Sequence, residues 1–164
     1  MVFMNYDEYS AKNHLLFSKL KVEIELVLPS AKVEHIGSSS ILGAISKGDL
    51  DIFVGVDPGS FNRSLAAIQE LDFRIKEDTL RTSDLCMLEH NTLSDVAIQL
   101  VSLGSEFDFF VSFRDALRQH PKLLHEYNSL KLDHSGSDVS TYRRAKSSFI
   151  AKVLQAHSKD KEQI

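Results

Sequence analysis

Two short groups of residues could together bind a nucleoside triphosphate and a metal ion. Gly37 and Ser38 form a small-residue turn, and after ten intervening residues the chain continues with Asp49, a leucine and Asp51. A glycine allows close approach of the backbone to a phosphate, and the amides around Ser38 and Ser39 could meet phosphate oxygens at the start of a short helix. Residues i and i+2 of a strand face the same way, so Asp49 and Asp51 are expected to present two carboxylates side by side.

The charge of these two carboxylates must be balanced. Carboxylates this close repel each other, and burying them without a counter-charge is costly. Magnesium prefers carboxylate and phosphate oxygens and keeps several of its waters, which suits a carboxylate pair beside a phosphate loop. We therefore predict that Asp49 and Asp51 are catalytic residues and ligands of Mg²⁺ or Mn²⁺, with Gly37, Ser38 and Ser39 as the phosphate-binding loop. A turn followed by a strand with a polar face is the alternative interpretation.

Periodicity and turn residues predict the elements that position these groups. Apolar residues three or four apart predict a helix over residues 7–28, starting at Asp7 as its cap. Strands are expected at 31–36, 49–56 and 73–76, with 80–88 and 92–101 as a hairpin around the polar turn 89–91; helices are expected at 60–71, 104–120, 121–132 and 140–157. The predicted fold is α/β (α+β), a small mixed β-sheet flanked by helices with a C-terminal helical segment. We expect a single domain over residues 1–164, sheet-rich over about 31–101 and helical over about 104–157.

Composition narrows the classes of protein that this chain can belong to. Its 164 residues suit one domain, and a net charge of -4 argues against wrapping duplex nucleic acid by bulk charge. A lone cysteine, Cys86, excludes an intramolecular disulfide and favours a reducing compartment. No run approaches the ~20 apolar residues that span a bilayer, and the N-terminus lacks a signal pattern. We therefore expect a cytoplasmic protein without a membrane partner.

The order of these motifs resembles that of a known group. A hydrophobic-Gly-Ser run, a gap and Asp-hydrophobic-Asp are similar to the signature of the nucleotidyltransferase superfamily (polymerase-β-like). The run Glu34-His35-Ile36-Gly37-Ser38-Ser39-Ser40, followed by Lys47 and Asp51-Ile52, more closely resembles the GrpB family, and so do Phe113-Arg114-Asp115, His120-Pro121, Glu126-Tyr127, Leu130-Lys131 and Ala145-Lys146. The resemblance extends over about residues 33–151. It implies a nucleotidyltransferase-like fold, and because the family pattern has lysines there, it favours Lys131 and Lys146 as phosphate-binding residues.

A third carboxylate is the missing part of the pattern. Transferases of this superfamily usually have it on a later strand, as a base or a second metal ligand, but Gln99 occupies that strand here and an amide cannot serve as a base. Asp95 shares the predicted face four residues earlier and is our candidate for a catalytic substitute; Asp84, on the preceding strand, is the alternative. A base at Asp95 would lie about 13 Å from Gln99 along a strand.

Two classes of function therefore stay open. The first is Mg-dependent transfer of a nucleoside monophosphate from ATP or another NTP to an unknown small-molecule or protein acceptor. The second is a nucleotide- or CoA-type binding module, or a partner-binding protein, that has the fold without the chemistry. The third carboxylate separates the two.

Several other side chains have both a structural and a functional interpretation. His35 could orient the loop by hydrogen bonding, and Arg114, Arg118 and Arg143 could neutralise phosphates or be solvated. Tyr127 and Tyr142 are expected to pack between helices, and four phenylalanines are expected in the core: Phe107, Phe109, Phe110 and Phe113. Cys86 is expected to be buried and inert. The histidines lack the spacing of a zinc site.

Overall fold

The computed structural model describes residues 2–162, and their side chains as far as residue 157. The elements, in chain order, are α1 (Tyr6–Val27), β1 (Lys32–Ile36), the 3-10 helix η1 (Ser38–Ser40), β2 (Leu50–Val56), the 3-10 helix η2 (Pro58–Ser60), α2 (Phe61–Gln69), β3 (Phe73–Ile75), β4 (Leu85–His90), β5 (Val96–Ser102), α3 (Phe110–Gln119), α4 (Pro121–Asp133) and α5 (Val139–Glu162). Within this part of the chain no helix is both long and apolar enough to cross a membrane.

The strands form one mixed sheet in the order β1-β2-β5-β4-β3. Only β2 and β5 are parallel; the other neighbouring pairs are antiparallel. A parallel pair needs a long connection, and here the chain leaves β2, forms α2, β3 and β4, and returns as β5 in the centre. The predicted mixed sheet with flanking helices is confirmed.

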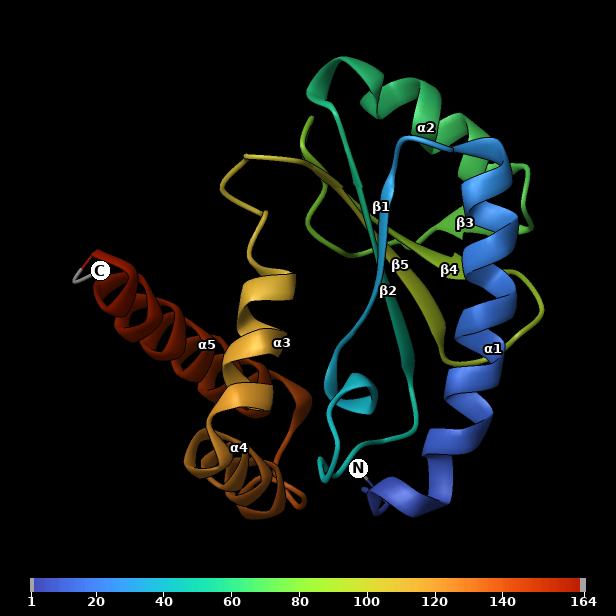
Figure 1. Ribbon diagram of the computed structural model, residues 1–164. Helices are drawn as coiled ribbons and strands as arrows, with labels where there is room; N and C mark the ends of the chain where they lie inside the picture. The colour runs from blue at the N-terminus through green and yellow to red at the C-terminus, as the bar shows by residue number, and fades with distance from the viewer. Residues whose placement is uncertain (1, 163–164) are drawn as a thin grey trace.

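Each face of the sheet is covered by different helices (Figure 1). Helices α1 and α2 pack on one face through Leu20, Ile24 and Ile68, over strand residues such as Ile52 and Ile98. On the other face, only part of the sheet is covered by apolar residues: Ile36, Phe53, Leu85 and Val101 contact Leu103, Phe107, Phe110 and Val111, which lead into α3. A third apolar cluster joins helices α3, α4 and α5 to the segment that follows η1. The buried residues of this cluster are Ile41, Ala44, Ala116, Leu117, Tyr127, Phe149 and Val153.

Three predicted boundaries are wrong in ways that affect the site. Strand β2 begins at Leu50, so Asp49 precedes the strand. Strand β4 continues to His90, through Glu89, which the sequence places in a turn. Strand β5 begins at Val96, so Asp95 lies in the turn before it, with a left-handed φ of 61°. The first helix also begins after Asn5, whose amide donates to the Glu8 carboxylate at 2.6 Å, rather than at Asp7.

Candidate functional site

The glycine loop lies directly against the carboxylate of Asp51. Gly37 follows β1, whose last residue, Ile36, is paired with Asp51 of β2. The Gly37 backbone has a φ of 74°, in the left-handed region that favours glycine, and a Cβ built there would lie 2.6 Å from Asp51 Oδ2. Only a glycine therefore lets the loop lie against this carboxylate. The two motifs that the sequence offers separately form one wall of the same cavity, together with Ser38.

Asp49 and Asp51 line that cavity in different electrostatic settings. Asp49 is partly exposed, and its Oδ2 lies 3.8 Å from Lys47 Nζ. Burial raises the pKa of the Asp51 carboxyl; the charges of Lys146 and Lys47 act in the opposite direction, whereas Asp49 raises the pKa further. A divalent cation bound by both carboxylates would offset their repulsion and the cost of burying Asp51. Among the described residues no group of three or more His, Cys, Asp and Glu side chains is placed to hold a metal ion. An ion held by this pair would therefore need further ligands, such as phosphate oxygens and water.

Ser39 contributes to the loop from the inside. Its hydroxyl is buried and lies 3.0 Å from Nε2 of His35, whose ring stacks on Phe17 with ring centres 5.1 Å apart. Burial lowers the pKa of His35 to about 4, and the neighbouring charge of His14 adds to this effect, so the ring is neutral at pH 7. His35 therefore orients the loop through Ser39, and a phosphate contact from Ser39 would have to come from its backbone amide.

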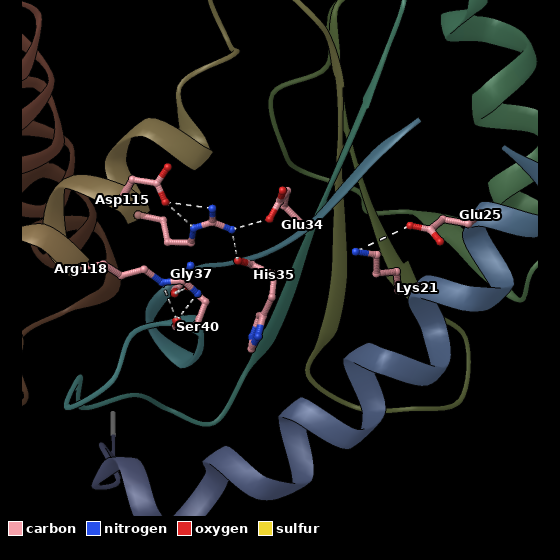
Figure 2. Close-up of polar contacts among 9 residues, drawn as sticks. Lys21, Glu25, Glu34, His35, Gly37, Ser40, Asp115 and Arg118 are labelled. Carbon is pink, nitrogen blue, oxygen red and sulfur yellow. Dashed lines mark hydrogen bonds and ion pairs between the residues drawn. The ribbon is translucent and has the colours of Figure 1, made fainter. Parts of the chain in front are cut away.

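Two arginines of α3 donate hydrogen bonds to the backbone around the loop; Arg114 is buried and Arg118 is exposed to solvent. Arg114 Nη1 donates to Glu34 Oε2 at 2.8 Å and to the His35 carbonyl at 2.9 Å. Arg118 donates twice to the Ser40 carbonyl, at 2.7 and 3.2 Å, as Figure 2 shows. These bonds fix the backbone on both sides of Gly37. The geometry gives both arginines a structural role in the loop. Arg114 also lines the cavity, and the phosphate contacts considered for both arginines from the sequence stay predictions.

Lys131 of α4 contacts Ser38 from the buried side of the loop. Its side chain is buried, and Nζ donates to Ser38 Oγ and to the Ile45 carbonyl, each at 2.5 Å. The same Nζ lies 4.2 Å from the centre of the Tyr127 ring. Burial lowers the pKa of Lys131 to about 7, with the charges of Lys146 and Lys47 adding to the effect. Lys131 lines a small side cavity of about 70 Å³ that also contains Asp49 and Asp51.

Lys146 of α5 lies near the carboxylates and acts on Asp51 electrostatically. It lines both cavities together with Asp51. Its pKa is raised, first by Tyr127, whose hydroxyl hydrogen bonds to it, and then by Tyr142 and Asp51, against the effect of burial. Lys146 is therefore a protonated amine beside Asp51. The structure places both lysines of the family pattern near the loop. Lys146 lines the main cavity and the small side cavity, whereas Lys131 lines the small side cavity alone.

The main cavity has a volume of about 700 Å³. It extends from Gly37 and Asp51 along the open face of the sheet and under α3 and α5, and this size is typical of small-molecule sites. Arg143 lies at its α5 wall. Tyr127 stacks on Phe149 with ring centres 5.3 Å apart, which confirms the prediction that it packs between helices.

An aromatic part of this cavity was missed by the sequence analysis. None of the four phenylalanines expected in the core is fully buried. Phe109 and Phe110 stack on each other with centres 4.6 Å apart, and both line the cavity with Phe113. Such rings offer faces on which a planar heterocycle can stack. The sequence places these residues in a helix that starts at residue 104, which is wrong, because α3 begins at Phe110. The four phenylalanines between residues 107 and 113 were the available signal.

The expectation for Asp95 is wrong in its geometry. Asp95 is exposed in the turn before β5, where its carbonyl accepts a hydrogen bond from the Leu50 backbone amide at 2.8 Å, and it lines the main cavity. It does not share a strand face with Gln99. Asp84 also precedes its strand and does not line either described cavity. On β5, the residue paired with Asp51 is Ala97, whereas Gln99 is paired with Phe53.

Comparison with known proteins agrees with the predicted fold. Residues 5–156 match the family described as GrpB protein. A UPF0157 protein of Vibrio cholerae is 50% identical over 154 residues, covering 94% of this chain and 82% of its own, and one of Deinococcus radiodurans is 29% identical over 142 residues, covering 85% and 74%.

Among solved structures, the conserved protein GrpB from Enterococcus faecalis matches with a TM-score of 0.75 at 18% identity, covering 97% of this chain and 98% of its own. The Cid1 poly(U) polymerase matches with a TM-score of 0.51 at 13% identity, and this chain covers only 38% of it. At these identities the likeness shows a shared nucleotidyltransferase-like fold. From its sequence match, the chain belongs to the GrpB family.

Proposed function

We propose that this protein binds ATP or another NTP together with Mg²⁺ and transfers the nucleoside monophosphate to a small-molecule or protein acceptor. The contact between Gly37 and Asp51 carries the proposal, because it joins a phosphate-type loop to a carboxylate pair in one cavity. Solved structures of the Cid1 poly(U) polymerase with the same fold are described with MgGTP and with MgATP bound.

The residues around the loop suit a triphosphate. The Ser38 hydroxyl and the amides of Ser38 and Ser39 would bind phosphate oxygens, and Lys146 would add a positive charge from the open side of the cavity. Lys131 would keep Ser38 in place through its hydrogen bond and respond to added negative charge by binding a proton. The rings of Phe109 and Phe110 would stack on the base.

The carboxylates define where the reaction would occur. Asp49 and Asp51 would hold the metal ion, which when bound offsets the negative charge of the triphosphate while the α-phosphoryl group moves. The acceptor forms a new bond to the α-phosphorus, and the bond from that phosphorus to the bridging oxygen breaks, releasing pyrophosphate. Gly37 keeps the loop against Asp51, so phosphate and carboxylate share one short stretch of the cavity wall.

One observation favours a second candidate, a binding module without transfer. Strand β5 has Ala97 where it pairs with Asp51, and no carboxylate occurs between Val96 and Ser102. Such a protein would bind the nucleotide and leave it intact. Transfer and binding must therefore be measured separately.

The central experiment combines thermal melting with the Asp51→Asn variant. We expect saturating ATP and Mg²⁺ to raise the Tm of the parent, because a ligand at 100 times its Kd adds about 2.7 kcal/mol to native-state stability, or roughly 5–10 °C for a domain of this size. Asp51→Asn should lose this shift, whereas its Tm without metal should be equal to or above that of the parent at pH 7. The sign follows from the raised pKa of Asp51: folding favours its protonated form, so the charged carboxylate costs stability above that pKa.

The exposed Asp133→Asn on α4 is the matched control and should keep the full shift. A full shift in the double variant Asp49→Asn and Asp51→Asn would refute the metal assignment. ATP labelled with ³²P at the α-phosphate, incubated with Mg²⁺ and a cell extract, then distinguishes transfer from binding. Label in new products supports transfer, and intact ATP with a full Tm shift supports the binding module.

A further inference from the structure

A row of four side chains crosses the open face of the sheet, starting at Asp51. The register pairs Asp51 of β2 with Ala97 of β5, Ala97 with Glu89 of β4, and Glu89 with Arg74 of β3. Residues paired in this way lie on the same face of a sheet. All four line the main cavity. The sequence does not reveal this row, because Glu89 lies in a run that looks like a turn.

Ala97 leaves space between the two carboxylates. Neighbouring strands are about 4.8 Å apart, so the Cα atoms of Asp51 and Glu89 are separated by roughly 10 Å. Only the Ala97 methyl lies in the row between them. A larger residue at that position would fill the gap. The acidic row therefore has an opening above Ala97 that could admit a hydroxyl group, with Asp51 on one side and Glu89 on the other.

Glu89 is oriented and accessible. Arg74 Nε donates to Glu89 Oε1 at 3.1 Å, and the side chain of Glu89 is 33% exposed. Among the described residues Oε2 has no hydrogen-bond partner. One oxygen is thus held in place, and the other is available to a group in the cavity.

The geometry points to a proton acceptor rather than a third metal ligand. No group of three acidic, His or Cys side chains in the described part of the chain is placed to share one ion. A base needs to reach the acceptor only, and a general base commonly accelerates a reaction by about 10²–10⁴-fold. Strand β5 offers no carboxylate for that role, but the next strand offers one in the same row as Asp51.

We propose that Glu89 is the general base that activates a hydroxyl-bearing acceptor, an inference that rests on the transferase function proposed above. Glu89 Oε2 takes the proton from the acceptor hydroxyl while the hydroxyl oxygen bonds to the α-phosphorus. The bond from phosphorus to the bridging oxygen breaks, and pyrophosphate leaves with that electron pair. Glu89 then returns its proton to water. Asp51 and Glu89 thus serve the two reacting partners from opposite sides of Ala97.

The test uses Glu89→Gln, which keeps the size of the side chain and an oxygen for the Arg74 bond but cannot bind the proton. Transfer is measured with α-³²P-labelled ATP, Mg²⁺ and a cell extract, and nucleotide binding is measured by the Tm shift with ATP and Mg²⁺. We expect transfer to fall by about 10²-fold or more with the Tm shift unchanged. Adding Ala97→Asp to Glu89→Gln should restore part of the activity, because it places a carboxylate next to Asp51.

The split between kcat and KM separates a base from a structural residue. Glu89→Gln should lower the kcat of transfer and leave the KM for ATP unchanged. The control is Glu77→Gln, the same change at an exposed position outside the cavity, which should behave like the parent.

Each remaining outcome overturns a distinct statement. Transfer by Glu89→Gln within three-fold of the parent would overturn the role of Glu89 and leave the transferase function standing. Loss of both transfer and the Tm shift in Glu89→Gln would show that Glu89 supports binding, which also overturns its role as a base. A parent that binds ATP and Mg²⁺ without transferring the label would overturn the transferase function, and the role of Glu89 with it.

Discussion

The buried amine of Lys131 makes the stability of this protein depend on pH in a predictable way. Its Nζ lies among Ser38, Ile45 and Tyr127, away from solvent. Burial lowers its pKa from the ordinary value of 10.5 to about 7. Between these two values the unfolded chain holds a proton on Lys131 that the folded protein has released. Unfolding therefore takes up a proton, and the free energy of unfolding must rise with pH over this range.

The size of the effect follows from the same two values. One pKa unit corresponds to about 1.4 kcal/mol, so the unfolding free energy should rise by about that amount per pH unit. The full difference between 10.5 and about 7 corresponds to roughly 5 kcal/mol. From pH 7.5 to 9.5 the parent should gain about 2–3 kcal/mol relative to a protein that lacks this amine. The gain is absent below about pH 6, where both states of Lys131 are protonated.

Lys131→Met removes the amine and keeps a flexible side chain of similar length. Urea denaturation of the parent and of Lys131→Met at pH 6, 7.5, 8.5 and 9.5 gives the difference in unfolding free energy, in which the titrations of groups that do not interact with Lys131 cancel. Lys152→Met is the control, because the Lys152 side chain is exposed. Its Nζ forms only a surface ion pair with Glu126 Oε2, at 3.7 Å. Parallel curves for the parent and Lys131→Met would refute the lowered pKa and the closed environment inferred for Lys131.

Two further predictions concern the loop. Gly37→Ala places a Cβ 2.6 Å from Asp51 Oδ2 in a left-handed backbone, so it should lower the free energy of unfolding more than Gly104→Ala. Gly104 also has a left-handed backbone, with a φ of 83°, but open space surrounds it. Equal losses for the two variants in urea denaturation would contradict the close contact at Gly37. Because the pKa of His35 is lowered to about 4 from 6.5, the parent should lose up to roughly 3 kcal/mol more than His35→Gln as the pH falls through this window, since unfolding then takes up a proton. The exposed His125→Gln should follow the parent in the same denaturation series, and a parent that loses no more stability than His35→Gln would overturn the neutral, buried state of His35.

The sequence predicts the motif well because its parts are local. Gly37 must be a glycine because its backbone is left-handed and a Cβ would clash with Asp51. Asp51 lies on the strand that follows the loop, so the spacing of the two motifs predicts that they line the same cavity. Most elements are also predicted close to their observed bounds. The roles of Asp49, Asp51 and the lysines in binding stay predictions.

Register is what the sequence could not supply. A shift of one residue moves every side chain of a strand to the other face. The run Glu89-His90-Asn91 has the composition of a turn, but its first two residues pair with the edge strand β3, Glu89 with Arg74 and His90 with Phe73. Tertiary pairing thus extends β4 against local preference. The true turn falls at 91–95, which removes Asp95 from the strand and brings Glu89 into the row with Asp51.

Long-range partners of helical charges are equally invisible in the sequence. Arg118 and Lys131 follow the sequence pattern of solvated helix residues, yet both donate hydrogen bonds to the loop. Arg118 bonds to Ser40, 78 residues earlier in the chain, and Lys131 bonds to Ser38, 93 residues earlier. Nothing in the spacing of a helix states which carbonyl a distant loop will present. Family resemblance gave the lysine as a candidate, and the structure gives it a partner, Ser38.

These contacts mean that the helical segment is part of the site. Helix α3 holds the Ser40 carbonyl through Arg118, α4 holds Ser38 through Lys131, and α5 places Lys146 beside Asp51 in both cavities. The glycine motif at the end of β1 is therefore shaped by three helices that come after the whole sheet in the chain. A ligand that stabilises the loop must also stabilise the docking of these helices, because binding and docking use the same residues. Slower amide exchange of α4 on addition of ATP and Mg²⁺ is the consequence that we expect. Unchanged exchange of α4 under conditions where ATP and Mg²⁺ raise the Tm would contradict this coupling between the loop and the helices.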